Sequence, residues 1–564
     1  MSAAATSDAD RPWLRKYPPG VPAHLDHPRQ MVPEMLEESV RRWPERAALR
    51  FSRSQWSYRR LEAESERFAA ALAREGVGPG DRVALCLPNC PAHPIALLGA
   101  LRLGATVCQL SPLWIGEDLE AVLRDAAPKV VVTLETLYPI LARTPSGPAI
   151  PLVYVARLRE FYPAPVRPFV NLAVRRHGFS TRFPAGPNVR AWRRAVRTPG
   201  ACPIYRGDPA TTVAVLQYTG GTTGTPKAAM LTHRNLLANV RQANAWNTTR
   251  RLGEEVYLAA IPLFHIYGLT VALLLALAEG GTVVLELRPD PAEILRLIQR
   301  YRPTQFPGVP ALYRALLERP DVGRYRLSSI RYCVSGSAAL PAETARRFER
   351  ATGGQLVEGY GLTEASPVTH ANPVQGERRP GSIGLPLPDT DQRIVEADGG
   401  LPLPPGEVGE LEVRGPQVML GYYGRPEETA AVLCDGWLRT GDLARVDPDG
   451  YAYLVDRKKD LINVGGLKVY PLEVERVLGE HPGVAEAAVV GVPDAAVGEV
   501  PRAFVVRAPG ATVTAEELAG FVRERLAHYK VPRSFEFRES LPKSGIQKLL
   551  RRQLRGEPSP TASR

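Results

Sequence analysis

A glycine- and threonine-rich segment that ends in a lysine is the clearest candidate for chemistry in this 564-residue chain. It reads Tyr-Thr-Gly-Gly-Thr-Thr-Gly-Thr-Pro-Lys over residues 218–227 and follows an apolar run, 211–217, that we expect to form a strand. Glycines let backbone N–H groups turn toward an anion, threonine hydroxyls add donors, and a lysine adds positive charge. The common P-loop differs, because its lysine directly follows a glycine and precedes Ser or Thr. We predict a polyphosphate-binding loop; the alternative, a flexible hairpin, needs fewer glycines and no lysine.

Four further motifs follow that segment in order along the chain. They are Tyr360-Gly-Leu-Thr-Glu364, Trp437-Leu-Arg-Thr-Gly-Asp442, Asp456-Arg-Lys-Lys-Asp460 and Leu541-Pro-Lys-Ser-Gly-Ile-Gln-Lys548. Together the five motifs resemble the acyl-adenylate-forming superfamily, which includes acyl-CoA synthetases, luciferases and peptide-synthetase adenylation domains. The resemblance covers the chain from about residue 30 to about residue 555.

The resemblance implies a reaction in two steps. A carboxylate attacks the α-phosphate of ATP, which gives an acyl-adenylate and pyrophosphate, and a thiol, usually that of coenzyme A, then displaces AMP. The first step brings two anions together, so it depends mainly on charge neutralisation and in-line positioning. ATP, Mg²⁺ and coenzyme A are therefore the cofactors and co-substrates that the resemblance implies.

The phosphate contacts of the family fall on the glycine-rich segment and on the motif that ends in Glu364. The residues expected to cradle the β- and γ-phosphates are Thr219, Gly220, Gly221, Thr222, Thr223, Gly224 and Lys227. The family commonly has serine where this chain has Gly220, so one hydroxyl contact is missing. Thr363 is expected to donate to the α-phosphate, and Glu364 to hold Mg²⁺, because carboxylate oxygen suits a hard cation.

The nucleoside contacts implied by the resemblance come from several motifs. Tyr360 is expected to stack on adenine, and its neighbouring glycines allow close approach of the backbone. The residues expected on this side of the nucleotide are Gly336, Ser337, Ala338, Glu358, Gly359, Tyr360 and Gly361. Ser337 replaces a glycine that is common in the family. Asp442 is expected to accept the ribose hydroxyls, and Arg457 to make a second ribose contact.

The expected catalytic cation is Lys548, which would reach both the carboxylate and the α-phosphate during adenylation. The family usually reads Gly-Lys at the position where this chain reads Gln547-Lys548. His265, in the run Pro262-Leu-Phe-His-Ile-Tyr-Gly268, is expected to gate the approach of the carboxylate.

The small C-terminal domain of the family rotates between the two half-reactions. The resemblance places the hinge at Lys459, two residues after the arginine that contacts the ribose. Rotation is expected to withdraw Lys548 and to present Gly465 and Gly466 toward the arm of coenzyme A.

Several details resemble bacterial long-chain fatty acid–CoA ligases in particular. These are Ser111-Pro-Leu-Trp114, the run 358–370 and an aromatic, basic segment at 155–200. We therefore predict activation of a fatty acid to acyl-AMP and its transfer to coenzyme A. The alternatives are a fatty acyl-AMP ligase that loads an acyl carrier protein, activation of another apolar or aromatic acid, and a non-catalytic nucleotide-binding protein. The apolar run 271–278 either lines an acyl tunnel or forms a plain core helix.

Composition narrows the class of protein. The six cysteines are scattered without a CxxC pair, which argues against a disulfide framework or a zinc site and favours a reducing cytosol. The N-terminus has no signal-peptide pattern, and the longest apolar run, 269–278, is far shorter than a bilayer span. We expect a cytoplasmic protein. Peripheral contact with the inner face of the membrane and a homodimer are both left open.

The net charge of the chain is +12, and many of its basic residues are concentrated in one segment. Residues 151–200 contain ten arginines and a single acid, Glu160, and aromatic residues lie among them, including Phe161, Tyr162, Phe169, Phe179, Phe183 and Trp192. Such a segment either lies on an anionic membrane surface or is a connecting insert whose aromatic residues pack down; nucleic acid is not predicted as a partner.

The predicted fold class is α/β, because short β-branched runs alternate with longer helical patterns. Residues 81–87 and 130–133 are expected to form buried strands, 61–76 an amphipathic helix and 92–103 an apolar helix. We expect a large N-terminal adenylate-forming domain over 31–458, with two α/β layers and a β-rich subdomain at about 378–458. A small mobile α+β domain is expected over 459–555, an arm over 1–30 and a tail over 556–564.

Overall fold

The computed structural model describes residues 11–144, 152–176, 179, 182–184, 186–219, 226–397, 400–494, 496–543 and 549–555. The chain divides into two compact units. Unit one contains Met1–Asp391 and Arg414–Gly436, and unit two contains Gln392–Val413 and Trp437–Arg564. Each unit is described by itself.

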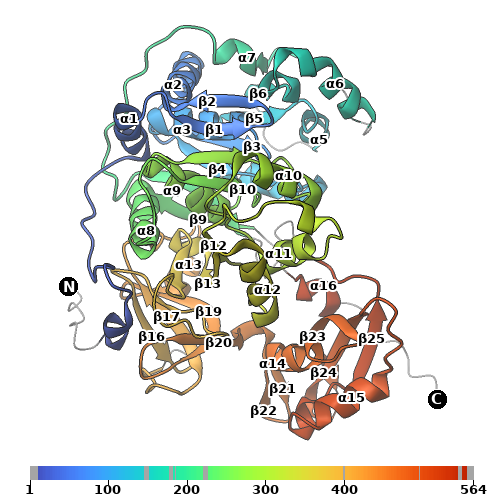
Figure 1. Cartoon of the computed structure of the whole chain (residues 1–564). Helices are drawn as coiled ribbons and strands as arrows, with labels where there is room; N and C mark the ends of the chain where they lie inside the picture. Colours follow the sequence, from blue (N-terminus) through green and yellow to red (C-terminus); the bar gives the residue numbers. More distant parts are fainter. Residues whose placement is uncertain are drawn as a thin grey trace. The chain divides into compact units, whose positions relative to one another are not determined.

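The first layer of unit one is a largely parallel sheet in the order β7-β6-β5-β3-β4-β8-β9. Figure 1 labels its strands β3, β4, β5, β6 and β9. Its strands are β3 (Arg82–Cys86), β4 (Thr106–Gln109), β5 (Val130–Leu134), β6 (Leu152–Ala156), β7 (Val189–Ala191), β8 (Val213–Thr219) and β9 (Lys227–Thr232). All neighbouring pairs are parallel except β8 and β9, which form an antiparallel hairpin at one edge. Residues such as Val131 and Val132 are fully buried, as expected when helices cover both faces of a parallel sheet.

The second layer joins two short sheets through Gln305, which bridges Tyr257 and Tyr332 in parallel register. The sheet orders are β10-β11-β1-β2 and β12-β13-β14-β15. The strands are β1 (Ala47–Phe51), β2 (Ser54–Ser57), β10 (Val256–Ala259), β11 (Thr282–Leu285), β12 (Tyr332–Ser335), β13 (Gln355–Gly361), β14 (Val368–Ala371) and β15 (Leu385–Pro386). The apolar cluster on this layer includes Leu258, Ile294, Phe306 and Tyr313.

Helices pack on the two layers of unit one. They are α1 (Val32–Arg42), α2 (Tyr58–Arg74), α3 (Ala92–Arg102), α4 (Gly116–Ala126), α5 (Tyr138–Arg143), α6 (Arg167–Arg176), α7 (Trp192–Ala195), α8 (His233–Trp246), α9 (Leu275–Ala278), α10 (Pro291–Tyr301), α11 (Pro310–Leu317), α12 (Ala342–Thr352) and α13 (Pro426–Val432). The run Gly268–Leu274, just before α9, is a π-helix.

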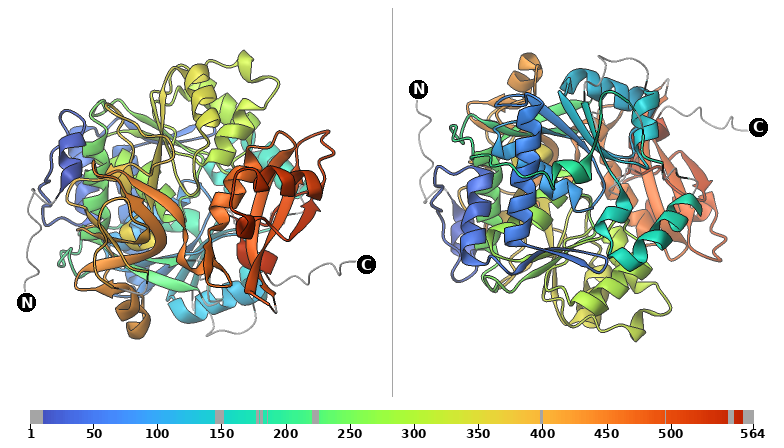
Figure 2. Two further views of the ribbon diagram at one scale, coloured as in Figure 1. Left: turned by 90° about the horizontal axis from the view of Figure 1, so that it is seen from below. Right: turned by 90° about the horizontal axis from the view of Figure 1, so that it is seen from above.

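The contact between α2 and α3 shows how the sequence produces this packing (Figure 2). The Ser57 side chain accepts from the Arg60 N–H and starts α2, whose buried residues Leu61, Phe68 and Leu72 lie on one face. Gly99 of α3 meets that face, and a Cβ added there would lie 2.8 Å from the carbonyl oxygen of Ser65. Only glycine therefore permits this close approach of the two helices.

Unit two contains two strand groups. The first includes β16 (Asp391–Val395), β17 (Gly409–Arg414), β19 (Trp437–Val446) and β20 (Ala452–Arg457). The second has the order β22-β21-β24-β23, with β25 paired to β24. Its strands are β21 (Ile462–Val464), β22 (Leu467–Val469), β23 (Val484–Asp494), β24 (Gly498–Arg507) and β25 (Ser534–Arg538). The helices are α14 (Pro471–Gly479), α15 (Ala515–Arg523) and α16 (Arg551–Arg555).

The predicted α/β class is confirmed, and so are the elements expected from periodicity. The helices predicted over 61–76 and 92–103 are α2 and α3, and the strands predicted over 81–87 and 130–133 are β3 and β5. The predicted domain boundaries stay predictions.

The basic segment 151–200 contributes more to the core than an insert would. It supplies β6 and β7 to the main sheet, and Phe161 and Trp192 are buried. Helix α6, in contrast, buries only Val174 and leaves Phe169 68% exposed and Leu172 48% exposed.

Candidate nucleotide-binding site

The predicted phosphate-binding loop connects the two strands of the β8–β9 hairpin. Thr219 lies opposite Lys227 in the antiparallel register, and its hydroxyl donates to the Lys227 carbonyl oxygen at 3.4 Å. Both ends of the loop are thereby fixed at the edge of the main sheet. The central residues of the prediction, Gly220, Gly221, Thr222, Thr223 and Gly224, lie outside the described residues.

The ammonium group of Lys227 contacts two side chains from the segment before and inside α13. It forms an ion pair with the Glu428 carboxylate, and it lies 5.6 Å from the centre of the Tyr422 ring. The Glu428 carboxylate therefore holds the Lys227 ammonium group at the edge of the hairpin, where the sequence predicts a phosphate contact.

The predicted metal ligand, Glu364, lies next to the same tyrosine. The Tyr422 hydroxyl donates to Glu364 Oε1 at 2.7 Å, and burial together with this carboxylate raises the pKa of Tyr422 well above its usual value. Among the described residues, no hydrogen bond or ion pair to Glu364 Oε2 is present. These contacts bring Lys227 and Glu364 together around the Tyr422 ring.

This donor set fits Mg²⁺. Mg²⁺ usually takes one or two protein carboxylates and completes its octahedral shell with water and substrate phosphates. One carboxylate oxygen of Glu364 is oriented by Tyr422 and the other has no partner in the described part of the chain. That part also contains no group of three or more His, Cys, Asp or Glu side chains that could hold a metal ion alone. Glu364, water and the phosphates of a bound nucleotide would together complete the shell of a Mg²⁺ ion.

The strand that leads to Glu364 is shaped by Gly361. A Cβ added at this position would lie 2.0 Å from the carbonyl oxygen of Pro367, so the two backbone segments approach as closely as only glycine allows. Tyr360, on the same strand, makes an edge contact with the His370 ring at 5.9 Å between centroids. Thr363 opens a 3-10 turn over Thr363–Ala365, which carries Glu364 directly after the strand.

The other predicted residues of the adenine side follow β12 and β13. Ser337, between Gly336 and Ala338, adopts a positive φ of 71°. Glu358, followed by Gly359, accepts a hydrogen bond from the Leu340 N–H at 3.4 Å, and burial raises its pKa to about 8.

His265 is tied to this region through Tyr267. The Tyr267 N–H donates to His265 Nδ1 at 3.2 Å, while the Tyr267 hydroxyl donates to the Val334 carbonyl oxygen at 2.7 Å. Val334 lies two residues before Gly336, so one buried tyrosine links the histidine loop to the adenine-side loop.

In unit two, the structure brings the two predicted ribose contacts together. Asp442 and Arg457 lie opposite each other on β19 and β20, and Arg457 Nε is 3.2 Å from Asp442 Oδ1. The arginine neutralises and orients the carboxylate, whose oxygens are acceptors of the kind that bind a ribose diol.

The remaining predictions in unit two concern the hinge and the second half-reaction. Lys459 lies in a 3-10 turn, Lys458–Asp460, and burial followed by the Arg457 charge lowers its pKa. Gly465 and Gly466 form the turn between β21 and β22, with positive φ angles of 58° and 89°. Lys548, the predicted catalytic cation, lies outside the described residues.

Two residues of this site were missed by the sequence analysis, namely Tyr422 and Glu428. The run Gly-Tyr-Tyr-Gly-Arg-Pro-Glu-Glu over 421–428 is aromatic and charged in a Gly/Pro-rich context, which is the available signal. In the structure this run pairs with β9, because the Tyr423 N–H donates to the Ala228 carbonyl oxygen at 2.9 Å. Its local sequence pattern does not predict that pairing.

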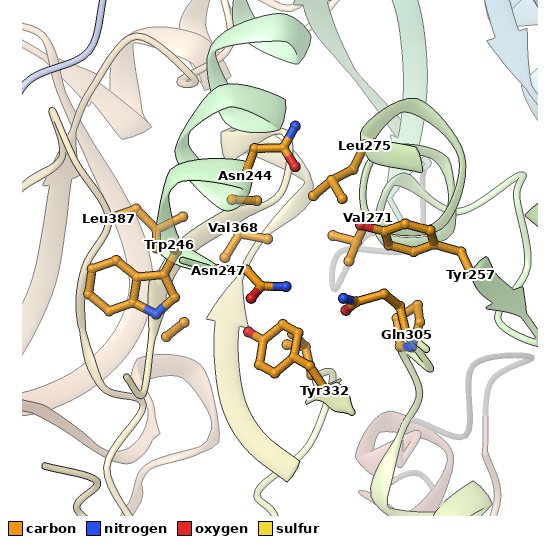
Figure 3. A pocket seen from close by; sticks show the side chains of 14 residues that line it. Asn244, Trp246, Asn247, Tyr257, Val271, Leu275, Gln305, Tyr332, Val368 and Leu387 are labelled. Atoms are coloured by element: carbon orange, nitrogen blue, oxygen red, sulfur yellow. The ribbon is translucent and has the colours of Figure 1, made fainter. Parts of the chain in front are cut away.

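A small internal cavity of about 40 Å³ lies beside these motifs in unit one (Figure 3). Apolar side chains form much of its wall, including Val271, Leu275 and Val368, and Tyr257, Tyr332 and Gln305 face it from the second layer. Val334, whose carbonyl oxygen accepts the hydrogen bond from the Tyr267 hydroxyl, also lines this cavity.

Within the described residues, no helix is both long and apolar enough to cross a membrane.

Comparison with known proteins identifies the family. The model of the AMP-binding enzyme family matches residues 36–423, and that of the AMP-binding enzyme C-terminal domain matches residues 473–548. A long-chain-fatty-acid–CoA ligase of Bacillus subtilis (strain 168) is 43% identical over 548 residues, which are 97% of this chain and 98% of the relative. An Escherichia coli O6:H1 protein of the same name is 39% identical over 97% of this chain and 98% of its own.

A solved structure agrees with these matches. The anthranilate CoA ligase AuaEII in complex with anthranoyl-AMP has a TM-score of 0.83 at 27% identity, covering 94% of this chain and 97% of its own. The chain belongs to the family of AMP-binding enzymes.

Proposed function

We propose that this chain is an AMP-forming long-chain fatty acid–CoA ligase. It activates a fatty acid with ATP to acyl-AMP and pyrophosphate, and then transfers the acyl group to coenzyme A with release of AMP. The observation that carries the proposal is the 43% identity to a long-chain-fatty-acid–CoA ligase over 97% of the chain.

The geometry of unit one supports the first step. Lys227 supplies the positive charge for the polyphosphate, and Glu364 supplies the carboxylate that would hold Mg²⁺. Mg²⁺, when bound, neutralises phosphate charge and so favours attack on the α-phosphate. Thr363, directly before the carboxylate in the same 3-10 turn, is proposed to donate to a phosphate oxygen. The apolar cavity lined by Val271 and Leu275 supports an apolar acyl group, although its present volume encloses only a small part of a long chain.

The geometry of unit two supports nucleotide binding and the second step. Asp442, held by Arg457, offers carboxylate oxygen to the ribose hydroxyls. Lys459 is proposed as the hinge, and Lys548 as the cation that assists attack of the fatty acid carboxylate. Gly465 and Gly466, in the exposed β21–β22 turn, are proposed to face coenzyme A.

The proposal is tested by AMP release with a panel of fatty acids from C6 to C18, each with coenzyme A or with an acyl carrier protein. We expect the highest turnover with the longer acids and coenzyme A. Turnover with the carrier protein alone would instead identify a fatty acyl-AMP ligase, and preference for an aromatic acid would contradict the proposed substrate class.

We further propose that α6 and the basic residues that follow it contact an anionic membrane. Phe169 and Leu172 are exposed on α6, and Arg175 and Arg176 end the same helix. Apolar side chains beside arginines are typical of a helix that lies in the membrane interface. Fatty acids partition into membranes, so such contact would place the enzyme near its substrate.

Replacing Arg175, Arg176, Arg193 and Arg194 by Gln is expected to lower binding to anionic vesicles. Each arginine that approaches the surface contributes about 1 kcal/mol, so the loss should exceed tenfold if two or more take part. Wild-type binding should also weaken as salt rises from about 0.05 to about 0.5 M, because screening shortens the range of the attraction.

The matched control replaces four exposed arginines elsewhere in unit one, namely Arg326, Arg346, Arg347 and Arg350, and removes the same net charge. Equal loss of vesicle binding in both variants would show that the overall net charge of the protein, and not these four arginines in particular, controls binding. Wild-type protein that does not co-sediment with anionic vesicles at low salt would contradict the membrane proposal outright.

A further inference from the structure

The segment 419–428 is fixed against both charged groups of the unit-one site. The Met419 N–H donates to the Glu364 carbonyl oxygen at 2.8 Å, and the Met230 N–H donates to the Gly421 carbonyl oxygen at 2.9 Å. These bonds, with the one from Tyr423 to Ala228, attach the segment to the Glu364 turn and to β9 at once. Side chains on the segment therefore have defined positions relative to both.

Tyr422 is the side chain that this arrangement places between the two charges. Its N–H donates to the Thr429 hydroxyl at 2.9 Å, and its own hydroxyl donates to Glu364 Oε1 at 2.7 Å. A hydrogen bond from a fixed donor restricts the rotation of a carboxylate. The Tyr422 hydroxyl therefore holds the Glu364 carboxylate in one orientation.

Glu428 acts on the other charge. It stands in the first turn of α13 and forms the ion pair with Lys227, with Arg425 Nε at 3.8 Å from its second oxygen. A polyphosphate carries several negative charges and would compete with this carboxylate for the same ammonium group. Binding of ATP must therefore exchange a protein anion for a phosphate oxygen at Lys227.

We propose that Tyr422 and Glu428 are positioning residues that set the resting state of the ATP site. Tyr422 orients the metal-binding carboxylate, and Glu428 occupies Lys227 until the phosphates displace it. This inference rests on the proposed function of the site. It predicts opposite effects on ATP binding, because one residue supports the metal-dependent contact and the other competes with the nucleotide.

Calorimetric titration of the full-length protein with ATP separates these roles. It is done without fatty acid and coenzyme A, so that no acyl transfer follows binding, once with Mg²⁺ and once with a chelator. The ratio of the two dissociation constants measures how much Mg²⁺ strengthens ATP binding. The variants are Tyr422→Phe and Glu428→Gln, with Tyr423→Phe and Glu427→Gln as neighbouring controls of the same chemistry.

Tyr422→Phe is expected to lower the Mg²⁺ enhancement about tenfold, the usual weight of a hydrogen bond to a charged group. Its ATP affinity in the chelator should match that of wild type, since the hydroxyl acts through the carboxylate. Glu428→Gln is expected to strengthen ATP binding in both titrations, by about threefold to tenfold, because a neutral amide no longer competes for Lys227.

The outcomes distinguish failure of the inference from failure of the proposed function. Wild-type protein that binds no ATP in either titration would contradict the proposed function itself. If wild type binds MgATP but Tyr422→Phe behaves like Tyr423→Phe, or if Glu428→Gln weakens binding, the positioning roles are wrong. Thermal unfolding of all four variants checks that each is folded at the titration temperature.

Discussion

Lys548→Ala is expected to abolish formation of acyl-AMP while sparing thioester formation from supplied acyl-AMP. Only the first half-reaction brings a carboxylate to the charged α-phosphate, so only that step needs an additional cation there. We expect the rate of adenylation to fall by at least about a hundredfold, the size typical for loss of one group that stabilises developing charge. Pyrophosphate release measures the first step, and acyl-CoA formed from synthetic acyl-AMP measures the second.

Lys543→Ala is the matched control for this prediction. Lys543 precedes Lys548 by five residues in the sequence, and its ammonium group is 2.7 Å from the Glu486 carboxylate. Its loss should leave both half-reactions within about threefold of wild type, as for an ordinary surface ion pair. Loss of the second step in Lys548→Ala would contradict the assignment of this lysine to adenylation alone.

The backbone after Lys548 has a firm anchor within unit two. Arg551 donates to both oxygens of Glu475, at 3.1 and 2.6 Å, and its Nη1 is 3.4 Å from Asp460. Arg555 is 3.2 Å from the same aspartate and also donates to the Lys459 carbonyl oxygen. Helix α16, which begins three residues after Lys548 in the sequence, is therefore attached to the turn that contains the predicted hinge.

Regular periodicity made much of the fold predictable from sequence. The amphipathic pattern of α2 indicates a helix buried on one face, and the mostly apolar, β-branched runs of β3 and β5 indicate strands buried on both faces. Segment 151–200 is harder to interpret from sequence. Its arginines suggest a surface segment, whereas the run Leu152–Ala156 forms a fully buried strand of the main sheet, next to the edge strand β7.

The candidate site was predictable only as far as its motifs extend. Lys227 and Glu364 stand out because their neighbours are glycines and threonines that suit phosphate. Tyr422, in contrast, meets Glu364 across 58 positions of sequence through a hydrogen bond that no local pattern encodes. Such a contact depends on which strand edge the 419–423 segment joins, and that is decided by tertiary packing.

Lys459→Pro is expected to have the converse effect to Lys548→Ala, because it acts on the proposed hinge. Lys459 lies in a 3-10 turn, whose φ of about −50° to −70° proline can adopt. The substitution should therefore tolerate this conformation of the turn but oppose any other φ that a domain rotation requires. We expect acyl-AMP to form at a rate within about threefold of wild type and its transfer to coenzyme A to slow by at least about tenfold.

Lys459→Ala separates the backbone from the side chain in this test. It removes the ammonium group, whose pKa is lowered by burial and by Arg457, but leaves φ free to change. If the hinge acts through the backbone, Lys459→Ala should retain the second half-reaction and only Lys459→Pro should accumulate acyl-AMP in a single turnover. Equal loss of both half-reactions in Lys459→Pro would indicate misfolding of the turn that Arg555 contacts. Accumulation of acyl-AMP in Lys459→Ala as well would assign the role to the ammonium group and not to the backbone.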